Sequence, residues 1–229
     1  MSLTGKRIAI TGAFGSLGAA VVQTALAAGA RVAAIDRADA PPAGIDLGAA
    51  GRFGGTDLAD ADQAKAAIDE AAMAMGGLDA LVNIAGTFRF ETLADGGTET
   101  WDFLYRVNLR TAVAASKAAL AHLPDGGRIV NIGAAGALKA GAGMGAYAAS
   151  KSGVMRFTES LAEELKPRGI TVNAVLPSII DTPPNRRDMP KADFGKWVKP
   201  SQLADVIVFL LSDQASAITG ALVPVTGRV

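Results

Sequence analysis

The chain of 229 residues contains no cysteine and only one histidine, His122. The lack of cysteine excludes disulfides, thiolate nucleophiles and zinc–thiolate sites, and a single histidine excludes a histidine-based metal cluster. We therefore expect no metal site. His122 stands just before Pro124, at the end of an alanine-rich stretch, where a role at the surface or as a helix cap is expected.

Neither sign of charge is in excess, because 22 lysine and arginine residues balance 22 aspartate and glutamate residues. Such a chain has no general electrostatic attraction for nucleic acid or for an anionic membrane. Apolar runs long enough to span a bilayer are also missing, as is the apolar core of a signal peptide. These absences predict a cytoplasmic protein without a nucleic-acid or membrane partner.

What the chain does contain is an alternation of short β-branched segments with longer alanine-rich ones, in a composition that is 50% hydrophobic. The predicted strands are Arg7–Thr11, Arg31–Ile35, a short third strand before Asp57, Leu78–Asn83, Arg128–Ile132, Ile170–Val175 and Val223–Thr226. Helices are expected near residues 15–29, 60–75, 98–122, 145–166 and 200–212.

Continuously apolar strands indicate burial on both faces, which is typical of a parallel sheet. With right-handed crossovers, residues 1–229 predict a single α/β domain, a Rossmann-type doubly wound parallel sheet of about seven strands with helices on both faces. Between Ile35 and Asp57 the chain is too rich in proline and glycine for a full crossover helix. Residues 177–200 contain five prolines and predict a substrate lid, mobile without ligand.

A glycine-rich turn follows the first predicted strand and leads directly into a helix. Backbone N–H groups of such a turn can approach a pyrophosphate, with the positive end of the helix dipole behind it. We expect this turn to bind a dinucleotide through Gly12, Phe14, Gly15, Ser16, Leu17 and Gly18.

Asp36 ends the second predicted strand, 18 residues beyond Gly18. A carboxylate at this place accepts hydrogen bonds from the adenosine ribose and repels a 2′-phosphate, which favours NAD over NADP. Arg37 follows directly and can partner a phosphate, so NADP stays open. Further cofactor contacts are expected from Asp57 and Leu58 near the adenine, and from Ala85 and Gly86 near the ribose.

Tyr147 and Lys151 lie four residues apart at the start of a predicted helix, so both side chains can point into one cleft. A phenol normally ionises near pH 10, and a neighbouring ammonium group lowers that value. Tyr147 is therefore the candidate acid or base, and Lys151 its partner.

Together these elements resemble the short-chain dehydrogenase/reductase family, over essentially the whole chain. Further matching positions are Asn108, Pro177, Ile180 and Thr182. The resemblance implies that Tyr147 donates or accepts the proton and that Lys151 binds the nicotinamide ribose. It also implies that Asn108 holds a water of the proton relay and that Thr182 contacts the carboxamide.

The main departure from the family pattern is Ala134, at the place of the catalytic serine 13 residues before Tyr147. Loss of such a donor typically costs about 10²–10³ in rate. Smaller departures are Ser16, Ile84 and Ser178, which replace a glycine, an asparagine and a glycine. The chain resembles dihydropteridine reductases in Ala134, in its glycine spacing and in residues 181–197. It resembles the classical reductases of the family in Asn108 and in the intact Tyr-x-x-Ser-Lys motif.

Three functions follow from these observations. The first is an NAD(H)-dependent oxidoreductase that acts on a small molecule. Reduction of a dihydropterin-like substrate is the most specific version of this prediction. The second is a carbonyl or alcohol dehydrogenase that uses Ser178 or a water as donor. The third is a catalytically silent NAD-binding regulatory protein, against which the retained Tyr147, Lys151 and Asn108 argue.

Two surfaces complete the expectations. The lid concentrates positive charge on Arg186, Arg187, Lys191, Lys196 and Lys199, mostly as a solvated face, while its Met189, Phe194 and Trp197 are candidates to close over a flat ring. The alanine-rich helices near 98–122 and 145–166 have a second small-residue face, and the resemblance implies a homodimer or homotetramer through them.

Overall fold

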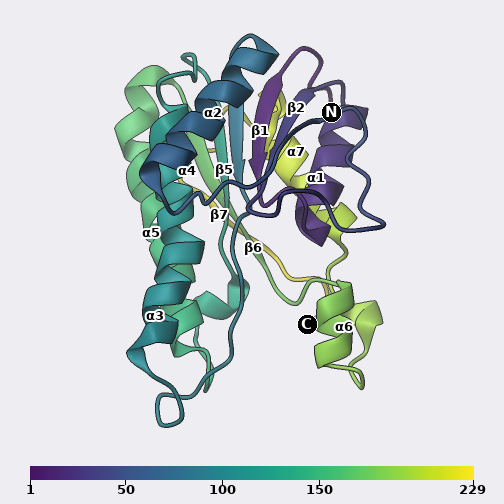
Figure 1. Ribbon diagram of the computed structural model, residues 1–229, viewed down its shortest axis with the longest axis vertical. Coiled ribbons are helices and arrows are strands. Elements are labelled where there is room, and N and C mark those ends of the chain that lie inside the picture. The colour runs from purple at the N-terminus through teal and green to yellow at the C-terminus, as the bar shows by residue number, and fades with distance from the viewer.

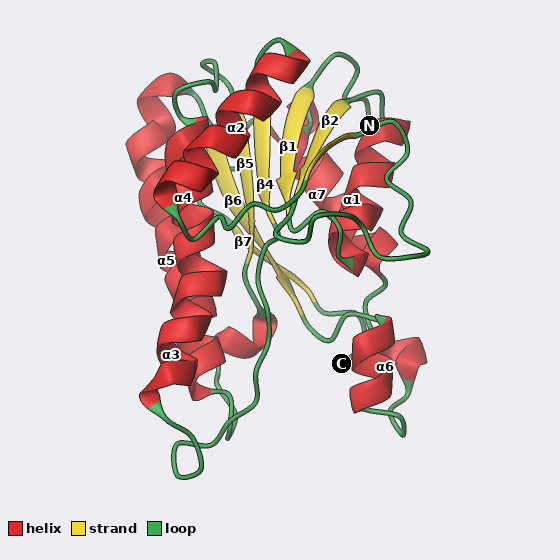
Figure 2. Ribbon diagram, viewed as in Figure 1, coloured by secondary structure: helices red, strands yellow, loops and turns green.

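The computed structural model describes residues 1–229 and contains a seven-stranded sheet between two layers of helices (Figure 1, Figure 2). The strands are β1 (Arg7–Thr11), β2 (Arg31–Ile35), β3 (Gly51–Phe53), β4 (Ala80–Asn83), β5 (Arg128–Ile132), β6 (Thr171–Pro177) and β7 (Leu222–Val225). Their order is β3-β2-β1-β4-β5-β6-β7, and every neighbouring pair is parallel. All strands therefore end at one edge of the sheet.

Helices cover both faces of the sheet (Figure 2). One face carries α1 (Ser16–Ala27) and α7 (Pro200–Leu211), which pack against each other. The other face carries α2 (Ala61–Met75), α4 (Thr111–Ala119) and α5 (Gly145–Leu165). Two short helices complete the fold, α3 (Thr98–Leu104) and α6 (Pro183–Asp188). None of the helices combines the length and the hydropathy needed to cross a membrane.

The core lies in two parts, one on each side of the sheet. Ile8 and Ile10 of β1 belong to the larger cluster, under α1 and α7, while Ala9 belongs to the cluster under α2, α4 and α5. Successive side chains of a strand point to opposite faces, so each strand needs apolar residues at every position. This double burial explains the continuous apolar strands in the sequence.

The predicted fold class is confirmed, and β1, β2 and β5 have the predicted bounds. No helix forms between β2 and β3, as the prolines and glycines of that segment predict. The predicted helix over residues 98–122 is instead interrupted by a π-helical turn, Tyr105–Arg110, between α3 and α4. Glycine and proline are absent from this turn, so its sequence has no local signal for the change.

The order of the strands reverses between β1 and β4, the position where folds of this kind bind ligands. Thr11 and Asn83, the last residues of these strands, are paired in register. The glycine-rich turn after β1 therefore meets Ile84 and Ala85, which follow β4. Beyond this edge, Figure 1 shows one lobe around α3 and a second lobe around α6.

Candidate active site

A cavity of about 660 Å³ opens at the edge where the strands end. Every residue expected to bind the cofactor lines it, from the glycine-rich turn through Asp36 and Asp57 to Tyr147, Lys151 and Thr182. The cavity also contains residues that the sequence analysis did not select, among them Thr56, Thr87, Phe103, Val107, Thr111 and Gly133. They come from loops and helices whose positions depend on the tertiary fold.

The glycine-rich turn is compact because two of its glycines have no room for a side chain. Gly12 has φ +63°, and a Cβ there would lie 2.8 Å from the Ala85 nitrogen. A Cβ on Gly18 would collide with the Gly12 carbonyl oxygen. At Gly15 the nearest atom would be 3.5 Å away, so this glycine leaves space on the cavity side. The turn therefore fits the approach of a dinucleotide diphosphate.

Asp36 is held beside the glycine-rich turn. Its Oδ2 accepts a hydrogen bond from the Phe14 nitrogen at 2.9 Å, and its Oδ1 accepts one from the Ala38 nitrogen at 3.1 Å. These bonds fix the carboxylate at the cavity wall, where it can meet an adenosine ribose. Arg37 is exposed on the same wall, and Asp57 is paired with Arg106 at 2.7 Å.

Tyr147 and Lys151 lie one turn apart at the start of α5 and both line the cavity. Lys151 is only 5% exposed, and its Nζ donates a hydrogen bond to the Ile132 carbonyl oxygen at 2.8 Å. Burial disfavours the charged form of each group. It lowers the pKa of Lys151 to about 8 and raises the pKa of Tyr147 to about 12. The shift of the Tyr147 pKa is opposite to the lowering expected from a neighbouring ammonium group, because burial is the larger effect here.

Asn108 lies in the π-helical turn, buried and outside the cavity lining. Its Oδ1 accepts from the Thr87 nitrogen at 2.7 Å, and its Nδ2 donates to the Thr87 carbonyl and to Ser150 Oγ. Ser150 in turn donates to the Tyr147 carbonyl at 2.8 Å. The Asn108 side chain thus connects the loop after β4 to the start of α5, which is a positioning role. No local sequence pattern indicates Thr87 as its partner.

Ala134 follows β5 and is buried, with an extended backbone. Ser178, the alternative donor considered from the sequence, lines the cavity, but its Oγ donates to the Thr226 carbonyl at 2.7 Å. The Ser178 hydroxyl hydrogen is therefore already used within the protein.

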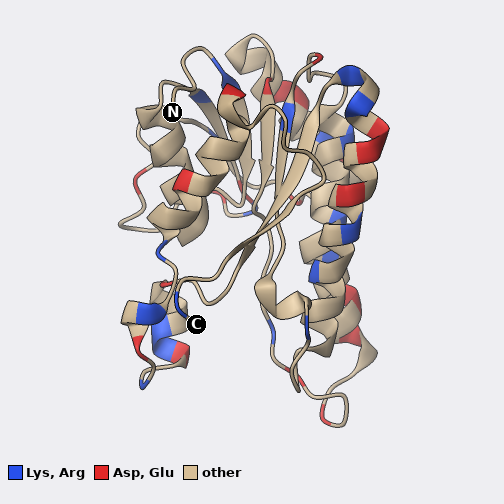
Figure 3. Cartoon of the chain, turned by 180° about the vertical axis from the view of Figure 1, so that it is seen from behind, with Lys and Arg blue, Asp and Glu red and all other residues tan.

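Residues 177–200, the predicted lid, contain a small core of their own. Thr182 caps α6, and Arg186 forms two hydrogen bonds with Asp181 while its guanidinium lies 4.6 Å from the Phe194 ring centroid. The Phe194 and Trp197 rings are 4.8 Å apart, and Trp197 is only 5% exposed. The Trp197 side chain is thus buried in this structure, and closure of these rings over a flat ligand stays a prediction. Figure 3 shows basic residues gathered on this lobe near the C-terminus.

The structure contains no group of three or more histidine, cysteine or acidic residues that is arranged to hold a metal ion. His122 instead bridges two helices: its Nε2 lies 2.7 Å from Asp69 Oδ1, joining the end of α4 to α2. Its role is structural, at a half-buried position between these helices.

Comparisons with known proteins agree with this geometry. The family model described as Enoyl-(Acyl carrier protein) reductase matches residues 12–227. The 2-(S)-hydroxypropyl-CoM dehydrogenase 3 of Xanthobacter autotrophicus is 36% identical, over 98% of this chain and 96% of the relative. The 3-oxoacyl-(acyl-carrier-protein) reductase FabG of Thermotoga maritima is 33% identical, over 99% of this chain and 98% of its own.

A solved structure shows the same fold. The crystal structure of a short chain dehydrogenase from Burkholderia cenocepacia in complex with NADP is 35% identical and superposes with a TM-score of 0.86. The match covers 99% of this chain and 98% of that one. The similarity in fold therefore extends over the complete domain.

Proposed function

The chain belongs to the short-chain dehydrogenase/reductase family, and we propose that it transfers a hydride between a nicotinamide dinucleotide and a small-molecule carbonyl or alcohol. One observation carries this proposal. The glycine-rich turn at Gly12–Gly18 and the Tyr147–Lys151 pair line the same cavity, so a bound dinucleotide would extend from the turn to the pair.

When bound, the nicotinamide supplies or accepts the hydride, and the protein supplies the proton transfer. We assign that transfer to Tyr147 Oη. With its pKa raised to about 12, the phenol is protonated near neutral pH and can donate to a carbonyl oxygen. Lys151, fixed at Ile132, carries a positive charge below its pKa of about 8 and stabilises the phenolate that donation leaves.

We propose NAD as the cofactor, because a carboxylate that lines the cavity beside the glycine-rich turn, as Asp36 does, would repel a 2′-phosphate. Its two backbone hydrogen bonds keep it there. NADP is bound by the Burkholderia structure, and Arg37 on the same wall is the residue that would favour it here. Dissociation constants for NADH and NADPH test this point, and tighter binding of NADPH would contradict it.

Ala134 favours a second candidate substrate. A quinonoid dihydropterin is already polarised as a hydride acceptor and needs no serine to hold a carbonyl. The relatives named above give this candidate no support, so we place it below a carbonyl substrate. This order reverses the preference drawn from the sequence alone.

Oxidation of NADH with a panel of ketones and with quinonoid dihydropterin tests these proposals. We expect turnover of at least one ketone. The Ala134→Ser variant should raise ketone turnover by about 10²-fold, since it restores an oxyanion donor. Tight NADH binding without turnover of any substrate would instead indicate a catalytically silent regulatory protein and contradict the proposed activity.

We also propose that the chain forms a homodimer or homotetramer. Apolar side chains are exposed at Trp101 in α3, at Tyr105 in the π-helical turn and at Val113 in α4, four and eight residues apart. This spacing places them near one face of the combined helix, a surface that a second copy can cover. Light scattering in solution tests the oligomeric state, and a monomer would contradict the proposal.

A further inference from the structure

Phe88 lies directly beside the proposed proton donor. Its ring centroid is 4.9 Å from that of Tyr147, and the two ring planes meet at 80°, an edge-to-face contact. Despite this contact, the Phe88 side chain is 54% exposed. A large apolar surface is thus uncovered next to the reacting phenol.

The loop that carries Phe88 is fixed on both sides. Before it, the backbone of Thr87 exchanges hydrogen bonds with the Asn108 side chain. After it, the Glu91 nitrogen donates to the Gly143 carbonyl at 2.9 Å, and the Phe90 ring lies against Gly143 so closely that a Cβ there would collide with it. Phe88 therefore has a defined place relative to Tyr147 before any ligand binds.

Ala134 creates a need for another contact that orients the substrate. Without a serine hydroxyl, and with Ser178 bonded to Thr226, the substrate oxygen has Tyr147 as its hydrogen-bond donor but lacks the usual second one. A single hydrogen bond fixes a carbonyl poorly, because the group can still rotate about it. Orientation then has to come from contact with the rest of the substrate.

We propose that Phe88 is a specificity-determining residue, whose exposed ring selects substrates that carry a flat aromatic group next to the reacting carbon. The proposal rests on the proposed function and deepens it by naming the substrate class, aryl ketones or the corresponding alcohols. An aromatic substituent stacks on the open side of Phe88 while its carbonyl oxygen meets Tyr147 Oη. Small aliphatic ketones cannot make both contacts.

The test compares kcat/KM for acetophenone, cyclohexyl methyl ketone and butan-2-one. Wild type should prefer acetophenone, and Phe88→Ala should lower kcat/KM for acetophenone about 10-fold or more, mainly through KM. Butan-2-one should change less than 3-fold, and Phe88→Tyr should keep the preference. Leu93→Ala is the matched control, because it removes an apolar side chain that is 81% exposed on the same loop and that does not hold the loop in place.

Equal losses for all three ketones, or the same loss in Leu93→Ala, would show that Phe88 does not select the aromatic group and would overturn the inference. A second measurement does not depend on turnover: the affinity of acetophenone for the complex with NAD, which should fall about 10-fold in Phe88→Ala while NADH affinity stays constant. Unchanged acetophenone affinity in Phe88→Ala would overturn the inference about Phe88 but not the proposed function. A wild type that binds acetophenone but reduces no ketone contradicts the proposed function alone.

Discussion

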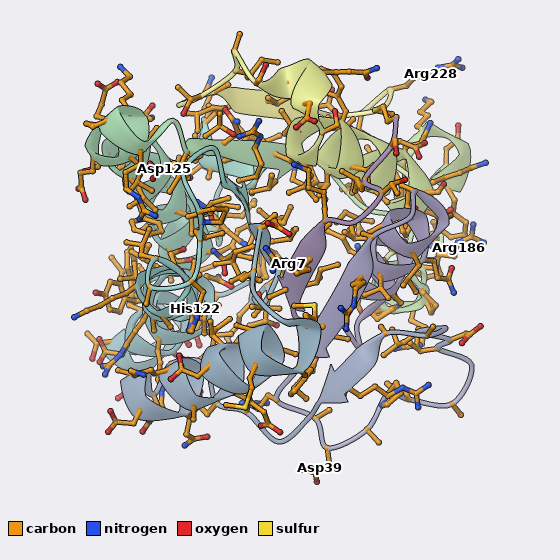
Figure 4. All side chains as sticks on the ribbon, turned by 90° about the horizontal axis from the view of Figure 1, so that it is seen from above. Arg7, Asp39, His122, Asp125, Arg186 and Arg228 are labelled. Atoms are coloured by element: carbon orange, nitrogen blue, oxygen red, sulfur yellow. The ribbon has the colours of Figure 1, made fainter.

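Ionisable side chains are paired at one edge of the sheet and unpaired at the other. At the edge where the strands begin, viewed in Figure 4, Arg7 donates hydrogen bonds to both carboxylate oxygens of Asp79 and to the Gly76 carbonyl. These bonds lower the pKa of Asp79 and raise the pKa of Arg7. At the other edge, Lys151 is buried and Tyr147 is half-buried, neither has an ionic partner, and desolvation moves both pKa values against the charged form.

The difference separates stability from chemistry within one sheet. Paired charges at the starting edge favour the folded state, because ionisation is easier there than in the unfolded chain. At the ending edge, burial costs stability by disfavouring the charged form of Lys151, and it moves the pKa of Lys151 toward neutral pH while it moves that of Tyr147 away from it. Substitutions at the two edges should therefore affect different properties.

The largest effect is expected at the ending edge. Tyr147→Phe removes the phenol hydroxyl and should lower kcat by about 10³-fold, since general acid catalysis typically contributes 10²–10⁴. Its free energy of unfolding should stay within about 0.5 kcal/mol of wild type, because the structure gives the hydroxyl no partner within the protein. Steady-state kinetics and urea unfolding measure both quantities. Tyr105→Phe, which changes the only other tyrosine, is the control and should leave both kcat and the free energy of unfolding unchanged. Retained activity in Tyr147→Phe would contradict the assignment of the chemistry to the ending edge.

Arg7→Ala should show the reverse behaviour. It leaves the partly buried Asp79 without its partner and should lower the free energy of unfolding by about 2 kcal/mol at pH 7, the range for hydrogen bonds to charged groups. The pKa of Asp79 is lowered in the folded state, so the stabilisation is present above pH 4 and is lost as the pH falls. The variant should therefore lose less stability than wild type on acidification.

Urea unfolding at pH 7 and at pH 3 measures this difference for Arg7→Ala. Arg52→Ala, at an exposed position of β3, is the matched control and should change stability by less than about 0.5 kcal/mol. The kcat of folded Arg7→Ala should equal that of wild type. A loss of kcat comparable to that of Tyr147→Phe would show that the two edges are not independent.

The smallest change is a gain in stability. Lys151→Met removes a buried amine and should raise the free energy of unfolding at pH 7 by about 1–3 kcal/mol, while activity is lost. The pKa of Lys151 is about 8 when folded and near its ordinary 10.5 when unfolded, so the unfolded chain binds more protons between these values. Wild-type stability should rise from pH 8 to pH 10.5 through this group, and the variant should lack that rise.

Unfolding of both proteins at pH 7 and pH 10 measures the gain from Lys151→Met. Lys117→Met on the exposed side of α4 controls for the removal of a positive charge and should have little effect. If Lys151→Met is less stable than wild type at pH 7, the hydrogen bond to Ile132 outweighs the cost of burial.

The sequence predicts well what depends on periodicity and composition. Strand bounds such as Arg7–Thr11 follow from apolar patterning, and Gly12–Gly18 follow from the steric demands of the turn. The prediction fails where partners come from distant segments. The bonds of Asn108 to Thr87 and Ser150, and the burial of Trp197, depend on loops whose packing has no local signal.

The base of the lid has a consequence for how this region changes over evolution. Ile180 and Val198 form a parallel bridge, with hydrogen bonds from the Asp181 nitrogen to the Val198 carbonyl and from the Val198 nitrogen to the Ile179 carbonyl. The chain therefore leaves and rejoins the domain at one closed neck. Beyond a closed neck, added residues cost only the small entropy of a longer loop. Residues between the two sides of this neck can therefore change in number without disturbing the sheet, whereas a change at Thr182, which lines the cavity, would reach the site.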